Sequence, residues 1–238
     1  MRTRTVRLIG IPVALAGLAW ALTEGIGAAA LKSHAGDLAY YTGRQLLLVG
    51  DSMALALAVG IPAGVLLSRP ALRRQAGPLM QLFNIGNTVP SLAVLAIALG
   101  LFGIGDAPAI AALFLASLLP IVRNTCEGVK NVSPALREAA RGIGMTGWQA
   151  LLRVELPNAM PVIVGGVRTA LAINVGTAPL AYLIGADSLG SLIFPGIYLD
   201  NDTLLLMGAA ATAIVALALD VLVALGSRQW LARHGVPA

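Results

Sequence analysis

The chain has 238 residues, of which 58% are hydrophobic and 11% are charged, with a formal net charge of +5. Soluble domains carry about 25% charged residues, so this composition excludes a water-exposed surface over most of the chain and indicates one polytopic membrane domain, 1–238. The single cysteine, Cys126, excludes an internal disulfide framework and a cysteine-ligated zinc site.

Six apolar runs are long enough to cross the roughly 30 Å hydrocarbon core of a bilayer. They lie at about 6–26, 44–67, 79–104, 107–124, 158–185 and 203–226. Only a turn between Gly103 and Pro108 separates the third run from the fourth, so five helices are the alternative count. The sequence therefore predicts an all-α fold with about six transmembrane helices.

The first run also resembles a secretory signal peptide, because Arg2, Arg4 and Arg7 precede it and alanines follow at 28–30. Its apolar core is at the upper end of the length of a signal peptide, and later runs already insert the chain repeatedly. We therefore expect a retained first helix rather than a cleaved leader.

Lys and Arg are concentrated in alternate connections between the runs. One side holds Arg2, Arg4, Arg7, Arg69, Arg73, Arg74, Arg123, Lys130, Arg137, Arg141, Arg153, Arg228 and Arg233. The other side holds only Lys32 and Arg44. Because basic loops stay in the cytoplasm, we expect the N-terminus and the 124–157 loop to be cytoplasmic. The basic character then reflects membrane topology, and nucleic acid is not an expected partner.

The longest predicted loop, 124–157, contains start and stop signals for two short helices. A Ser-Pro pair at 133–134 predicts the start of the first helix, and Gly142 and Gly144 predict its end. We expect a helix, a glycine turn and a second helix.

The second short helix is predicted to be capped by Thr146, to run through 149–154 and to stop at Pro157. The hairpin then has one apolar side, formed by Ala139, Ala140, Ile143, Trp148, Leu151 and Leu152. This side is suited to a groove on another protein, and packing on the membrane surface is the alternative.

The same loop carries a longer pattern. Glu138-Ala139-Ala140, three residues, Gly144, nine residues, Val154, Glu155 and Leu156-Pro157 follow one another. This string resembles the EAA loop of bacterial ABC importer permeases, and its one departure is Val154 in place of Ile, which keeps a similar shape. The resemblance implies a type I ABC importer permease fold whose loop docks on a separate ATPase. The residues carried over to that contact are Glu138, Ala139, Ala140, Gly144, Val154, Leu156 and Pro157.

Strings on both sides of the loop narrow the resemblance. They lie at 119–125, 161–163, 166–170, 173–178 and 183–186. They resemble permeases for the quaternary-amine osmoprotectants glycine betaine, choline and carnitine. The match departs at Asp187-Ser188, where those permeases usually have Gly-Gly. An ABC permease for another small solute is therefore the alternative.

The resemblance also implies the partners and the location. The chain has no G-x-x-x-x-G-K-[ST] motif, so we expect it to hold no cofactor, and ATP and Mg to be bound by an ABC ATPase subunit. An extracytoplasmic substrate-binding protein and a second permease copy or paralogue complete the implied assembly. The implied location is the bacterial cytoplasmic (inner) membrane.

Polar residues inside the third and fifth predicted helices are our candidates for lining the translocation pathway. They are Asn84, Asn87, Thr88, Pro90, Arg168, Asn174 and Thr177. Their alternative role is to bond helix to helix, and for Arg168 we favour pairing with an acid. We expect Asp220 to pair with a basic loop residue. Gly60 and Gly64, four residues apart, are expected to bring helices close together.

Catalytic interpretations find little support. The G-x-G-x-x-G string at 142–147 has no strand before it, which argues against dinucleotide binding. Ser52 has no histidine within reach, since His34 and His234 lie on opposite sides of the predicted topology. We therefore expect no enzyme. A self-contained channel or ion-coupled transporter is the remaining alternative, and it would leave the hairpin without a role.

Overall fold

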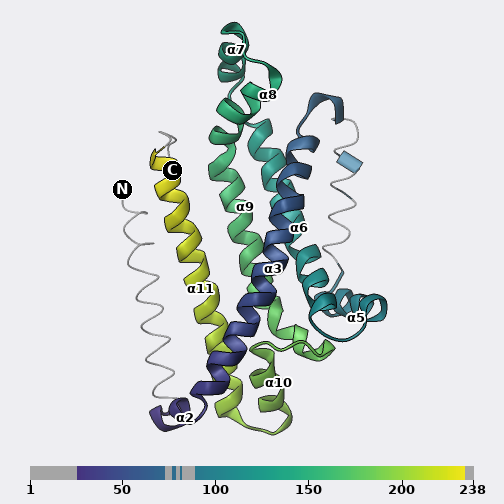
Figure 1. The fold of residues 1–238 in the computed structure, drawn as a ribbon, viewed down its shortest axis with the longest axis vertical. Coiled ribbons are helices and arrows are strands. Elements are labelled where there is room, and N and C mark those ends of the chain that lie inside the picture. The colour runs from purple at the N-terminus through teal and green to yellow at the C-terminus, as the bar shows by residue number, and fades with distance from the viewer. Residues whose placement is uncertain (1–25, 73–76, 79–80, 82–88, 234–238) are drawn as a thin grey trace. The chain divides into compact units, whose positions relative to one another are not determined.

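The computed structural model describes residues 26–72, 77–78, 81 and 89–233. Within this part of the chain, every regular element is helical (Figure 1). The elements are α2 (Ala28–Ser33), α3 (Ala35–Leu67), η1 (Pro70–Leu72), α5 (Ser91–Phe102), α6 (Asp106–Lys130), α7 (Pro134–Gly142), α8 (Gly147–Ala150), η2 (Leu151–Glu155), α9 (Leu156–Thr177), η3 (Ala178–Ile184), α10 (Gly190–Tyr198) and α11 (Asp202–Arg233). The expected all-α class is confirmed.

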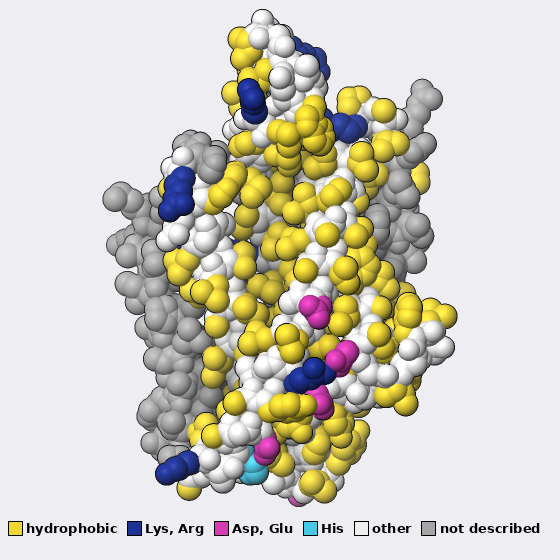
Figure 2. Space-filling view, in the orientation of Figure 1, with side chains coloured by type: hydrophobic (Ala, Val, Ile, Leu, Met, Phe, Trp, Pro, Cys, Tyr) yellow, Lys and Arg dark blue, Asp and Glu magenta, His cyan; other side chains and the backbone are white. Residues whose placement is uncertain are grey.

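Four helical runs are long and apolar enough to cross a membrane: Ala35–Leu67, Asp106–Lys130, Gly147–Ile184 and Asp202–Arg233. The apolar helix α5 is shorter. Figure 2 shows hydrophobic side chains over most of the described surface on the face in view, with few charged ones among them. The chain is therefore a polytopic helical membrane protein. The predicted first helix, 6–26, and most of 79–88 lie outside the described residues.

Several helices extend beyond the predicted apolar runs. The second predicted helix begins at Ala35 rather than at residue 44, the fourth ends at Lys130 rather than at 124, and the last continues to Arg233 rather than 226. A run of apolar residues marks the part of a helix that lies in lipid, whereas intrahelical hydrogen bonds form equally well in the water beyond it. Hydropathy therefore underestimated helix length.

The chain divides into two compact units. The first consists of Met1–Asp51, Leu92–Leu113 and Asn174–Leu219, and the second of Ser52–Ser91, Phe114–Ile173 and Asp220–Ala238. The boundaries between the units fall inside α3, α6, α9 and α11 and directly after the first residue of α5. The expected single transmembrane domain stays a prediction.

In the first unit, η3, α10 and the start of α11 approach one another too closely for larger side chains. A Cβ added to Gly190 would lie 1.9 Å from the Pro179 carbonyl oxygen, and one added to Gly196 would lie 2.6 Å from the Leu205 nitrogen. The rings of Tyr182 and Phe194 stack with centroids 5.5 Å apart. Glycine at these positions allows backbone to pack on backbone.

Polar side chains connect α3 to the rest of the same unit. The Tyr40 hydroxyl donates to Asp187 over 3.0 Å, and an Arg44 guanidinium nitrogen donates to Asp106 over 2.5 Å. The fully buried Gln45 accepts a hydrogen bond from the Leu189 amide over 3.2 Å. The contacts to Asp187 and Leu189 fix the turn between η3 and α10 against α3, and the contact to Asp106 fixes the start of α6 against α3.

In the second unit, α3 and α9 both pack against α6 through glycines. A Cβ on Gly64 would lie 2.5 Å from the Cβ of Thr125, and one on Gly166 would lie 2.8 Å from the Pro120 carbonyl oxygen. A Cβ on Gly60 would meet Ile121 at 2.7 Å. Gly60 and Gly64 thus bring two helices together, as expected from their spacing.

The α3–α6 contact generates a stability prediction. Gly64→Ala forces a Cβ against backbone and a β-branched residue, and we expect it to lower the free energy of unfolding by about 1–3 kcal/mol. The matched control is Gly50→Ala in the same helix, where an added Cβ has nothing within 4 Å. Thermal unfolding of the purified protein in detergent measures both variants. Equal melting temperatures for the two would contradict close packing at Gly64.

Candidate coupling hairpin and intramembrane polar groups

The first arm of the 124–157 loop is the helix α7. Ser133 occupies the N-cap position and Pro134 starts the helix, as predicted. The Ser133 side chain makes no capping bond, and its carbonyl accepts from the amides of Leu136 and Arg137 instead. After Gly142, the turn passes through Gly144 with φ of 79°. That left-handed backbone favours glycine and lets the chain reverse.

The second arm begins with a complete capping box. The Thr146 hydroxyl accepts from the Gln149 amide over 3.3 Å, and the Gln149 side chain accepts from the Thr146 amide over 2.9 Å. These reciprocal bonds satisfy two amides that the first turn of α8 leaves without helical partners. The prediction that Thr146 caps this arm is confirmed.

The prediction that Pro157 stops the second arm is wrong. α8 leads into a π-helical turn, η2, and α9 follows from Leu156 without a break, so Pro157 lies in the first turn of α9. The Leu156 amide bonds to the Leu151 carbonyl, five residues back, and this wider turn precedes the residue that lacks an amide hydrogen. The hairpin is therefore continuous with a membrane-spanning helix.

The predicted apolar side of the hairpin divides into buried and exposed residues. Ala140 and Leu151 are buried. In contrast, Ile143 is 73% exposed, Trp148 67% and Leu152 46%. Three large apolar side chains on the hairpin are thus available to another surface.

The motif residues occupy different environments. Glu138, Ala139 and Gly144 are exposed, and Val154, Leu156 and Pro157 are partly buried at the root of the hairpin. The Val154 carbonyl accepts from the Asn158 side chain over 2.7 Å. Exposed residues lie at the tip side of the hairpin and partly buried ones where it joins α9.

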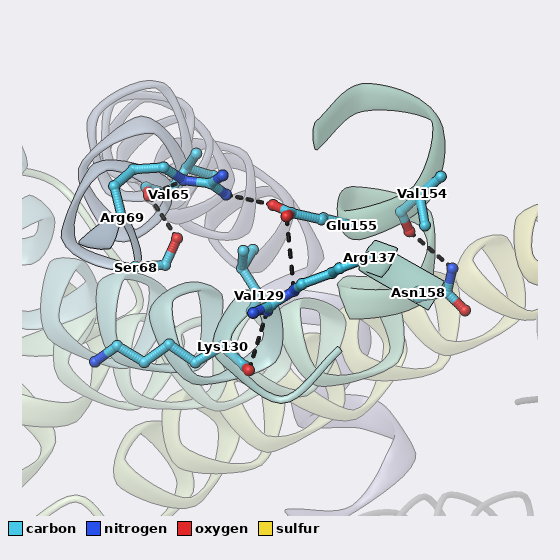
Figure 3. A network of polar contacts seen from close by, with 9 residues as sticks. All are labelled: Val65, Ser68, Arg69, Val129, Lys130, Arg137, Val154, Glu155 and Asn158. Atoms are coloured by element: carbon cyan, nitrogen blue, oxygen red, sulfur yellow. Dashed lines mark hydrogen bonds and ion pairs between the residues drawn. The ribbon is translucent and has the colours of Figure 1, made fainter. Parts of the chain in front are cut away.

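An ionic network at the base of the hairpin was missed by the sequence reasoning (Figure 3). An Arg69 guanidinium nitrogen donates to Glu155 over 2.6 Å, and Arg137 Nε lies 3.6 Å from the other Glu155 oxygen. Arg137 also donates to the carbonyls of Val129 and Lys130 at the end of α6. The sequence pattern identifies these two arginines only as determinants of membrane topology. The sequence signal that could have revealed this network is the acid Glu155, which lies at the junction of the basic loop and α9.

The predicted pathway residues are only partly described. Asn84, Asn87 and Thr88 lie outside the described residues, and Pro90 is exposed. Asn174 is fully buried and its amide group donates to the Leu113 carbonyl over 3.4 Å, while the Thr177 hydroxyl donates to the Asn174 carbonyl over 3.1 Å. Contact of these residues with a solute stays a prediction.

Arg168 and Asp220 form a bidentate ion pair between α9 and α11. Arg168 Nε and Nη2 each donate to one Asp220 oxygen over 2.6 Å. The expectation that Asp220 pairs with a basic loop residue is wrong, because its partner lies in a second spanning helix. A charge inside the membrane needs a nearby opposite charge, and two helices can supply it at the same depth.

Among the residues that the structure describes, no group of three His, Cys, Asp or Glu side chains is placed to hold a metal ion. Cys126 is buried with a free thiol in an apolar cluster with Leu67, Leu118 and Val122. The polar chemistry of the described chain thus consists of ion pairs between helices and an exposed hairpin.

A family model and the sequences of curated proteins both match this chain to components of membrane transport systems. The family described as binding-protein-dependent transport system inner membrane component matches residues 60–234. The osmoprotectant import permease protein OsmY of Salmonella typhimurium is 56% identical over all 238 residues, covering 99% of that protein. The glycine betaine/carnitine/choline transport system permease protein OpuCB of Bacillus subtilis is 41% identical over 84% of this chain and 91% of its own length.

Solved structures share the fold at low sequence identity. A chain of the MetNI methionine ABC transporter in an inward-facing conformation gives a TM-score of 0.69 at 23% identity, with 83% of this chain and 95% of that chain covered. A chain of an amino acid ABC transporter with histidines gives 0.68 at 18% identity, with 84% and 97% covered. These likenesses concern the fold alone.

The Arg168–Asp220 pair generates the second prediction. Asp220→Asn leaves the Arg168 charge inside the membrane without its acid, and we expect a loss of about 1–3 kcal/mol in unfolding free energy, less than for a fully buried pair. The double variant Arg168→Gln/Asp220→Asn should recover most of that loss, and Asp51→Asn, at an exposed acid of α3, is the control. Thermal unfolding in detergent tests this. A double variant less stable than Asp220→Asn would contradict it.

Proposed function

From the premise that the chain belongs to the family of binding-protein-dependent transport system inner membrane components, we propose that it carries a quaternary-amine osmoprotectant across the membrane. The chain is a permease of the ABC importer class, and in this proposal it acts as a transport subunit and not as an enzyme. Glycine betaine, choline and carnitine are the proposed substrates. The observation that carries this proposal is the likeness, over the whole chain, to an osmoprotectant import permease.

Energy for transport comes, in this proposal, from a separate ATPase subunit. The sequence lacks a P-loop motif, so ATP and Mg bind to that partner. The exposed apolar side chains Ile143, Trp148 and Leu152 supply the docking surface, and the glycine turn at Gly144 presents it. Because α8 continues through η2 into α9, a movement of the docked hairpin is transmitted directly to a spanning helix.

The orientation follows from the distribution of charge. We propose that the hairpin and the N-terminus face the cytoplasm of a bacterial cell, with the chain in the inner membrane. The basic residues Arg137, Arg141 and Arg153 on the hairpin favour this side. A substrate-binding protein then delivers the solute from the opposite side, and a second permease copy or paralogue completes the pathway.

A permease for a different small solute is the second candidate. The observation that favours it is Asp187, at the position where the osmoprotectant permeases that this chain resembles usually have glycine. Asp187 accepts a hydrogen bond from Tyr40, so the turn that it occupies is held differently from a Gly-Gly turn. Transport measurements therefore distinguish between the two candidate classes of substrate.

Uptake of radiolabelled glycine betaine, choline and carnitine tests the proposal. Cells that contain the ATPase and binding-protein genes are compared with and without this chain, at low and high osmolarity. We expect uptake of at least one compound to require the chain, to stop when ATP is depleted and to persist when the proton gradient is collapsed. Uptake that stops with the gradient alone would favour an ion-coupled transporter, and transport of none of the three would contradict the proposed substrate class.

A further inference from the structure

The ionic network at the base of the hairpin joins three segments that are distant in the sequence. Arg69 follows the end of α3, the carbonyls of Val129 and Lys130 end α6, and Glu155 ends the π-helical turn before α9 (Figure 3). Among the residues labelled in Figure 3, Glu155 is the only acid, and both Arg69 and Arg137 contact its carboxylate. The Glu155 carboxylate therefore contacts the end of α3 directly through Arg69, and the end of α6 through Arg137 of α7.

The environment of Glu155 makes it a firm connection. Its side chain is 12% exposed, and an anion with so little water around it depends on its two cations. Arg137, the second cation, is itself held by carbonyls at the C-terminal end of α6, where the helix dipole favours positive charge. Arg69 is fixed further because its Nε donates to the Val65 carbonyl over 3.3 Å. Each arginine that contacts Glu155 thus has a second anchor, Arg69 on α3 and Arg137 on α6.

The chain itself connects the hairpin to these helices in different ways. η2 continues covalently into α9, so a movement of the hairpin reaches α9 along the helix axis. The route along the chain from Arg69 to Arg137 passes through many intervening residues, whereas the 2.6 Å bond to Glu155 is direct. A movement of the hairpin can therefore reach α3 through this bond.

We propose that Glu155 is a positioning residue that makes α3 and α6 move together with the hairpin, so that ATP hydrolysis by a docked ATPase is converted into transport. This proposal rests on the proposed function, in which the hairpin receives the ATPase. Glu155 occupies the variable position of the EAA pattern, between Val154 and Leu156, so the pattern itself assigns it no role. Its predicted effect is on coupling, not on assembly.

The test uses the complete complex in proteoliposomes, with glycine betaine, choline or carnitine as the transported probe. Glu155→Gln keeps the size of the side chain and removes its charge. We expect normal binding of the ATPase, ATP hydrolysis close to wild type, and solute transported per ATP hydrolysed reduced by about fivefold or more. Arg69→Gln should behave alike, and Arg69→Lys, which keeps a cation near Glu155, should recover much of the ratio.

The matched control is Glu127→Gln on α6, at an exposed acid whose side chain is 3.9 Å from Lys130. It should leave the transport ratio unchanged. If wild type, Glu127→Gln and Glu155→Gln all transport the same amount of solute per ATP hydrolysed, the proposed function stands and the role of Glu155 is refuted. A Glu155→Gln complex that loses hydrolysis and transport in equal proportion, or that fails to assemble, also refutes it, because that result means a merely structural role.

Discussion

The close approach of α3 and α9 to α6 is the constraint on which the second unit depends. Lipid is as apolar as the side chains it surrounds, so burial of apolar area cannot by itself hold these helices together. Gly64 and Gly166 allow backbone and Cβ atoms to meet at distances that any larger residue would prevent. Van der Waals contact over these short distances then holds the three helix segments together within the unit, and closely packed helices can transmit a force that is applied at one end.

The hairpin supplies the place where such a force can act. Its turn is fixed by Gly144 and its second arm by the capping box at Thr146, so the exposed Trp148 is presented on a defined structure rather than on a loose loop. The second arm continues without interruption into α9, and Glu155 connects the same root to Arg69. Local sequence signals form the hairpin, and long-range contacts connect it to the spanning helices.

This division also explains what could be predicted from the sequence. The start at Pro134, the turn at Gly144 and the cap at Thr146 depend on neighbouring residues, and the sequence contains all of that information. The contacts Arg69–Glu155 and Arg168–Asp220 join residues 86 and 52 positions apart, which no local pattern reports. Pro157 was misassigned because proline usually ends a helix, whereas here a π-helical turn precedes it. Four of the six apolar runs correspond to described helices that are long enough to span a membrane, and hydropathy missed the ends of those helices.

The proposed function requires that a separate ATPase docks on the hairpin from the cytoplasm. A photo-crosslinking amino acid in place of the 67% exposed Trp148 tests this in intact cells that express the chain with its ATPase and binding protein. The matched position is Tyr198, 71% exposed at the end of α10. We expect a covalent adduct with the ATPase from position 148 and none from position 198. An adduct of position 148 with the binding protein, or with lipid alone, would contradict it.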